Sequence, residues 1–213
     1  AGIKPIIGIE SYLAARSMTD KEVKEDKKSS HLLLLAENEK GYHNLLQIAT
    51  AAQLQGFYYS PRVDKNFLAS HSEGLIATTG CMAAEVPRLI ENGRMDEARR
   101  QLDWYYDVFG KENFFMELQQ HNIKELDDLN RKLMEMGPRY EARYVATNDV
   151  HYINPEDAKY QDILLAIQTS ALLADPDRMR MIDGSYYLRS PQEMERLFAE
   201  IPESLSNTVL IAE

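Results

Sequence analysis

The sequence contains a single cysteine, Cys81, and it contains neither a signal peptide nor an apolar run long enough to cross a membrane. One cysteine excludes an internal disulfide and fits a reducing compartment, so we expect a cytoplasmic protein. The missing apolar run predicts that the protein has no membrane partner.

The sequence has fewer basic than acidic residues. The chain has 24 Lys and Arg residues against 34 Asp and Glu residues, a formal net charge of −10. Binding to nucleic-acid phosphates needs clustered cations, so these residues do not form a DNA-binding surface by themselves. The one basic run, residues 21–28, is interrupted by Glu22, Glu25 and Asp26, and we predict a solvated loop there.

The 213 residues can bury a substantial core, either as one large α/β domain or as one domain with an appendage. The chain opens on Ala1-Gly-Ile-Lys-Pro, without a methionine, and enters a strand-like run directly. We therefore expect it to be part of a longer protein.

Strand-like and helical patterns alternate along the chain. Short runs rich in Ile, Leu, Val or Phe predict strands over Lys4–Leu13, His31–Ala36, Gly74–Thr79, Asn113–Leu118 and Arg143–Thr147. Apolar residues three and four apart predict helices over Tyr42–Gln55, Met95–Phe109 and Ile123–Met136, the last two ended by Gly110 and Gly137. N-terminal caps at Asn154-Pro155 and Ser190-Pro-Gln-Glu193 predict helices to Gln168 and Phe198. This alternation indicates an α/β fold, either a barrel or an open parallel sheet.

The segment Val145-Ala-Thr-Asn-Asp-Val-His-Tyr152 carries the first candidate site. An apolar, β-branched run leads into Asp149 and His151, two potential metal ligands spaced i, i+2. In a strand this spacing directs both side chains to the same face. Barrel enzymes build metal sites from a carboxylate and an imidazole placed in this way at a strand end.

Other predicted strands also place metal-ligating residue types at their ends. Glu10 ends one apolar run, Cys81 follows another, and Glu117 and His121 flank a third. His31 begins its predicted strand instead of ending it. It lies at the same edge of the sheet as Glu10 only if its strand runs antiparallel to Lys4–Leu13.

Each of these residues also has a structural interpretation. Cys81 fits a small buried residue, Glu10 and Glu117 fit surface ion pairs, and His121 fits a capping residue or a residue behind the ligands. Four strand ends that deliver Glu, Cys, Asp and His favour a metal site, although these residue types name neither a metal nor a substrate.

Longer strings carry a resemblance over essentially the whole chain. Gly2-Ile-Lys-Pro-Ile-Ile-Gly-Ile-Glu10 and the segment from Val145 to His151 resemble the PHP (polymerase and histidinol phosphatase) domain of the alpha subunit of bacterial DNA polymerase III. Supporting strings start at Gly41, Gly74, Leu164, Tyr186 and Asn207. The resemblance implies an incomplete, distorted β/α (TIM-like, PHP-type) barrel over residues 1–170. A C-terminal helical extension over residues 171–213 would lead toward the polymerase body.

The resemblance also implies a multinuclear metal centre. Glu10, His31, Cys81, Asp149 and His151 match ligand positions of the family, whereas Glu117 and His121 lie in a similar segment without that assignment. The family's opening H-x-H strand would precede Ala1, so the cluster here is partial. The catalytic residues stay unassigned, with Asp149 and His151 expected to take part.

This mixed donor set suits zinc or manganese, and magnesium would belong to a polymerase body beyond Glu213. The implied chemistry is phosphoester hydrolysis, as a 3′→5′ exonuclease that proofreads DNA synthesis. Two alternatives stay open: a non-catalytic module that stabilises the polymerase or docks a proofreading subunit, and an independent PHP phosphatase. The implied partners are DNA, bound through the parent polymerase, and other subunits of the replicative holoenzyme.

Overall fold

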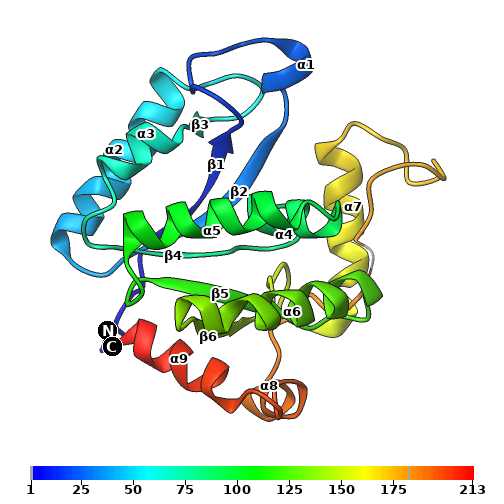
Figure 1. Cartoon of the computed structure of the whole chain (residues 1–213). Coiled ribbons are helices and arrows are strands. Elements are labelled where there is room, and N and C mark those ends of the chain that lie inside the picture. Colours follow the sequence, from blue (N-terminus) through cyan, green and yellow to red (C-terminus); the bar gives the residue numbers. More distant parts are fainter. Residues whose placement is uncertain (1, 182) are drawn as a thin grey trace.

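The computed structural model describes residues 2–181 and 183–213 and contains a six-stranded sheet in the order β3-β1-β2-β4-β5-β6 (Figure 1). Strand β2 is antiparallel to β1 and β4, and the other neighbouring pairs are parallel. The strands are β1 Gly8–Ala14, β2 Ser29–Ala36, β3 Arg62–Val63, β4 Leu75–Thr78, β5 Phe114–Gln119 and β6 Arg143–Thr147. The helices are α1 Val23–Asp26, α2 Glu39–Leu54, α3 Lys65–Ala69, α4 Glu85–Glu91, α5 Met95–Phe109, α6 Lys124–Met136, α7 Ala158–Gln168, α8 Pro191–Leu197 and α9 Pro202–Ala212, with 3₁₀ turns η1 Gly137–Tyr140 and η2 Pro155–Asp157.

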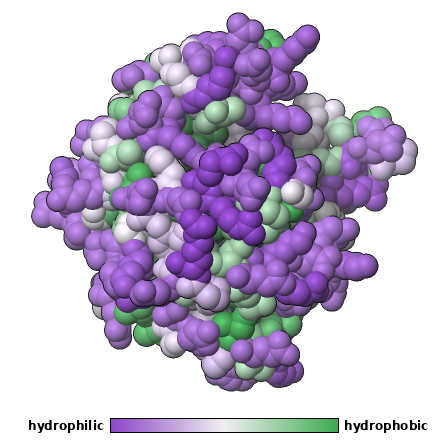
Figure 2. Space-filling view, in the orientation of Figure 1, coloured by the Kyte–Doolittle hydropathy of each residue, from purple (hydrophilic) through white to green (hydrophobic). Residues whose placement is uncertain are grey.

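The two faces of the sheet are covered unequally, because alternate residues of a strand point to opposite faces. Leu34, Ala77 and Met116 face the main core, against α2, α4, α5 and α6. The opposite face carries only a small cluster of Ile76, Phe115 and Val145, against which Ile211 of α9 packs. The surface seen in Figure 2 is mainly hydrophilic, with hydrophobic residues showing near its lower edge.

The α/β class predicted from the sequence is confirmed. The described strands form an open row from β3 to β6, so a closed barrel is not shown. Helix α5 has the predicted bounds, and capping boxes form at Asn154 with Asp157 and at Ser190 with Glu193. Within the described ranges, every helix is too short or too polar to span a membrane.

Helix α6 ends at Met136 and Gly137 follows it as predicted, although the φ of Gly137 is −54° and the chain continues through η1 to Glu141, whose φ is 50°. Two local predictions are wrong. Strand β1 starts at Gly8 instead of residue 4. Residues 21–28 are not simply a solvated loop, because they contain α1, where the Asp26 side chain is fully buried.

Arg62 organises this part of the fold. Its side chain is fully buried, and its guanidinium donates to the carbonyls of Gly56 (3.1 Å), Asp26 (2.7 Å), Met18 (3.2 Å) and Asp20 (3.0 Å). These bonds satisfy carbonyls that the strands and helices leave unpaired. Arg62 therefore fixes the segment that connects β1 to β2.

We expect Arg62→Met to destabilise the fold by about 3–5 kcal/mol, because it leaves buried carbonyls without donors. Equilibrium urea unfolding measures this change. The matched control is Arg100→Met on the exposed side of α5, which should change the free energy of unfolding by less than about 0.5 kcal/mol. Equal stability of the two variants would contradict the role of Arg62.

The ion pair between Arg16 and Asp26 makes the stability depend on pH. Arg16 donates to both Asp26 carboxylate oxygens, at 3.0 and 2.6 Å, and these bonds lower the pKa of Asp26. A lowered folded-state pKa stabilises the fold above the unfolded-state pKa of about 3.9, and this contribution is lost as the pH falls through the folded-state pKa. Asp26→Asn should therefore lower the urea midpoint at pH 7, and the difference from wild type should shrink below about pH 4. A difference that stays constant down to pH 3 would refute this account.

Candidate metal centre

Strand pairing brings Glu10 and His31 together. Because β2 is antiparallel to β1, Tyr12 pairs with His31 and Glu10 pairs with Leu33, so Glu10 and His31 are diagonal neighbours on one face. This confirms the expected antiparallel arrangement of the two strands. Glu10 lies in the middle of β1, however, and not at its end as predicted.

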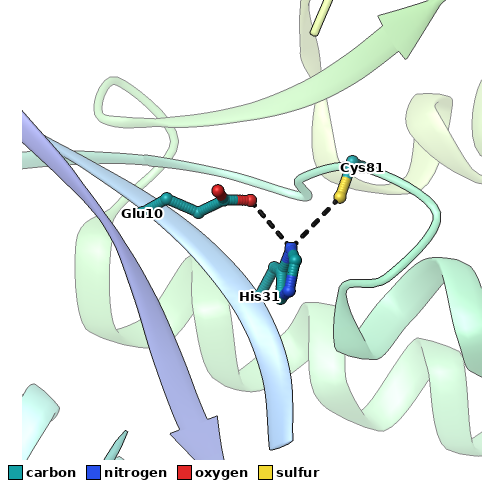
Figure 3. A group of neighbouring side chains, drawn as sticks. All are labelled: Glu10, His31 and Cys81. Atoms are coloured by element: carbon teal, nitrogen blue, oxygen red, sulfur yellow. Dashed lines mark hydrogen bonds and ion pairs between the residues drawn. The ribbon is translucent and has the colours of Figure 1, made fainter. Parts of the chain in front are cut away.

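Cys81 reaches the same place from the loop after β4. The backbone N–H of His31 donates to the carbonyl of Ala83 (3.2 Å), which holds that loop beside the start of β2. Figure 3 shows the carboxylate of Glu10 and the thiol of Cys81 converging on His31 Nδ1, at 2.8 Å and 3.6 Å. One ligand atom from each of the three residues lies within 4.8 Å of the others.

These contacts shift the pKa values of His31 and Glu10. Hydrogen bonds to Cys81 and then Glu10 raise the pKa of His31 to about 10, although partial burial opposes the charge. The same contact with His31 lowers the pKa of Glu10. A cation held by these three side chains would occupy the space where Glu10 and Cys81 contact His31 Nδ1.

Asp149 and His151 lie in the loop after β6 and not within a strand. The prediction that a strand directs both side chains to one face is therefore wrong. Asp149 has a φ of 42°, and its carbonyl contacts His151 Nδ1 at 2.7 Å. This tight turn directs both side chains toward the other candidates. Burial raises the pKa of Asp149.

The five predicted ligands line one cavity of about 330 Å³, together with His121. Strands and loops from opposite ends of the sequence thus deliver Glu10, His31, Cys81, Asp149 and His151 to a shared space. Asp149 and His151 stand outside the tight group of three, so the five do not form a single compact cluster.

Glu117 does not line this cavity. Its buried carboxylate accepts hydrogen bonds from Thr78 (2.5 Å), Thr147 (2.6 Å) and Gln119 (2.8 Å). Glu117 thereby ties β4, β5 and β6 together beneath the site. Every oxygen of its carboxylate is used, which gives it a structural role.

The residues after 178 supply a wall of the cavity that sequence reasoning did not identify. Met179, Arg180, Met181 and Tyr186 line it, and the ring of Tyr186 stacks on His121 at 4.1 Å. The backbone N–H of His151 donates to the backbone carbonyl of Tyr186 (2.8 Å), and this bond holds the segment beside the loop after β6. No periodicity or spacing marks these residues, and the only signal was the string from Tyr186 to Ser190.

The donor set fits a divalent cation. Carboxylate oxygen, imidazole nitrogen and thiolate sulfur are the usual ligands of zinc, at about 2.0–2.3 Å each, which places ligands of one ion about 3–4 Å apart. The contacts of 2.8 and 3.6 Å lie near that spacing. Such an ion would replace the proton on His31.

Known proteins are similar to this sequence. The family model of the PHP domain matches residues 1–121. The chain is 46% identical to the DNA polymerase III subunit alpha of Borreliella burgdorferi over 100% of its own length and 19% of that protein. It is 42% identical to those of Thermus aquaticus and Treponema pallidum, over 99% and 100% of the chain and 18% of each relative.

The chain thus spans about a fifth of the length of these curated relatives. The family match covers Glu10, His31 and Cys81 together with the sheet from β1 to β5. Since that match takes in more than half of the residues, the chain belongs to the PHP domain family.

Proposed function

We propose that this chain is the PHP portion of a bacterial replicative DNA polymerase, the alpha subunit of DNA polymerase III. The support is a match over the whole chain to relatives of that name, each about five times longer. In this proposal the parent protein is a DNA-directed DNA polymerase of the cytoplasm, working with other holoenzyme subunits. Its nucleotidyl-transfer site and magnesium belong to the remaining part.

The domain itself binds zinc or manganese through Glu10, His31, Cys81, Asp149 and His151. The observation that carries this proposal is the convergence of these five residues, from widely separated segments, on one cavity. A thiolate beside imidazoles and carboxylates suits zinc, and the carboxylates also suit manganese. Further ligands and the strands that complete a barrel would come from residues preceding Ala1.

The chemistry assigned to the site is phosphodiester hydrolysis at a DNA 3′ end. A bound metal would supply a Lewis acid for activating water and for stabilising charge on the phosphate oxygens. Glu10, His31 and Cys81, placed by β1, β2 and the loop after β4, would hold it. Asp149 would accept a hydrogen bond from the attacking water; as the water oxygen bonds to phosphorus its proton would pass to solvent, and the ester oxygen would leave by taking up a proton from solvent. His151 contributes a neutral imidazole.

The acidic chain carries a net charge of −10, so DNA is held mainly by other parts of the protein. Residues 171–213 form the connector toward the polymerase body. Helix α9, the last helix of this segment, packs on β6, where Asn207 Nδ2 donates to the Tyr144 carbonyl (2.8 Å), so the C-terminal end of the connector is attached to the sheet.

The exonuclease proposal predicts the effect of removing Asp149 and His151. In the full-length protein, Asp149→Asn with His151→Ala should lower metal-dependent release of 3′-terminal nucleotides by about 100-fold or more, because water positioning and metal binding are both lost. DNA synthesis by the same preparation should persist, since it uses a different site. An unchanged rate of nucleotide release in the double variant would refute the exonuclease activity.

Metal content tests the binding site separately from activity. We expect His31→Ala to weaken metal affinity at least about 10- to 100-fold, measured by elemental analysis after dialysis against limiting zinc or manganese. His43→Ala is the matched control, because His43 is exposed on α2 and does not line the cavity. Equal metal content in both variants would instead favour the non-catalytic, structural module.

A further inference from the structure

His121 is a buried imidazole in the wall of the cavity that the proposed metal centre does not use. It is 4% exposed and lies two residues after the end of β5. Burial lowers its pKa to about 4, so the ring is neutral near neutral pH. It stands outside the tight group of Glu10, His31 and Cys81.

A chain of hydrogen bonds fixes which ring nitrogen of His121 carries the proton. Asp183 Oδ2 accepts from the backbone N–H of Asn122 (2.9 Å) and lies 2.5 Å from Ser185 Oγ. Although burial opposes ionisation, these hydrogen bonds lower the pKa of Asp183, which is therefore a carboxylate and donates nothing. The single hydroxyl proton of Ser185 must point to Asp183.

Ser185 Oγ is then an acceptor toward His121. The contact of 2.7 Å between Ser185 Oγ and His121 Nδ1 requires that Nδ1 carries the ring proton and donates it. The other nitrogen, Nε2, keeps an unshared electron pair. Nε2 is buried and has no hydrogen-bond partner among residues 2–181 and 183–213.

A buried acceptor without a partner is unfavourable, and native proteins rarely retain one unless a further group satisfies it. His121 lines the same cavity as Glu10, His31, Cys81, Asp149 and His151. A donor brought into this cavity would satisfy Nε2.

We propose that His121 accepts a hydrogen bond through Nε2 from an O–H group held in the cavity. This inference rests on the proposed hydrolytic function. That reaction would bring two O–H groups into the cavity, the attacking water and a hydroxyl of the bound ester. Ser185 and Asp183 are positioning residues, because they act through the ring by fixing its tautomer and orientation. The neutral ring orients the donor and does not take its proton.

Two substitutions in the full-length protein distinguish the role of Nδ1 from the role of Nε2 in His121. His121→Asn keeps a donor near Nδ1 for Ser185 but removes the acceptor, and it should lower the rate of nucleotide release about 10- to 100-fold. His121→Gln places an amide oxygen near the position of Nε2 and should recover part of that loss. Metal content and the thermal midpoint should match wild type in both, and His43→Asn should change neither rate nor metal content.

The kinetic parameters identify the donor. A fall in kcat at constant KM assigns the hydrogen bond to the attacking water, whereas a rise in KM at constant kcat assigns it to a substrate hydroxyl. Ser185→Ala should shift the same parameter in the same direction by a smaller factor. Full activity of His121→Asn, or equal losses in the Asn and Gln variants, would overturn the proposal.

A crystal structure of the full-length protein with manganese and inorganic phosphate provides a readout that does not need activity. We expect a water or phosphate oxygen about 2.6–3.2 Å from His121 Nε2. A structure in which Nε2 accepts from a protein donor, or in which no water or phosphate oxygen lies near it, would overturn the inference. If wild type hydrolyses no ester, the proposed function fails, and this structure alone decides the role of His121.

Discussion

The antiparallel pairing of β2 with β1 determines where the candidate ligands meet. His31 is the third residue of β2, not its first as predicted, and in an all-parallel sheet it would lie at the edge opposite the loops that follow β4 and β6. The reversed direction of β2 brings His31 beside Glu10 and the loop that carries Cys81. A shift of the β1–β2 register by one residue would turn the Glu10 side chain into the main core, so the register is also constrained by the cost of burying that charge.

The cavity is bounded by the sheet, its floor, and by a loop segment, its wall. The floor is the sheet, in which Glu117 connects three strands through Thr78 and Thr147. The wall is a loop segment that follows α7 and is held by scattered contacts, such as Arg189 to the Gln120 carbonyl (2.7 Å). Side chains on the sheet are therefore held by paired strands, whereas those of the wall are held by the contacts of a loop segment.

Sequence reasoning predicted the α/β class and most strands and helices, because hydrophobic periodicity and caps leave local signals. The grouping of Glu10, His31, Cys81, Asp149 and His151 was expected from the family resemblance, and the five residues line one cavity. Local signals failed where tertiary contacts override them, as in the burial of Asp26, which depends on its hydrogen bonds with Arg16. The sequence assigned Asp149 and His151 to a strand face, yet a left-handed turn at Asp149 places them. The Asp183–Ser185–His121 chain joins residues more than 60 positions apart, and no local pattern records it.

That chain has a consequence for the order in which the molecule folds. The pairing of β1 with β2 closes a short loop, whereas the contacts of Ser185 with His121 and of Arg189 with Gln120 span 64 and 69 residues. Long loops close slowly because their entropy must be lost first, so the wall should dock after the sheet has formed. By the same reasoning it is the first part to open in native-state fluctuations. We therefore expect the wall to be the last part of the binding cavity to form.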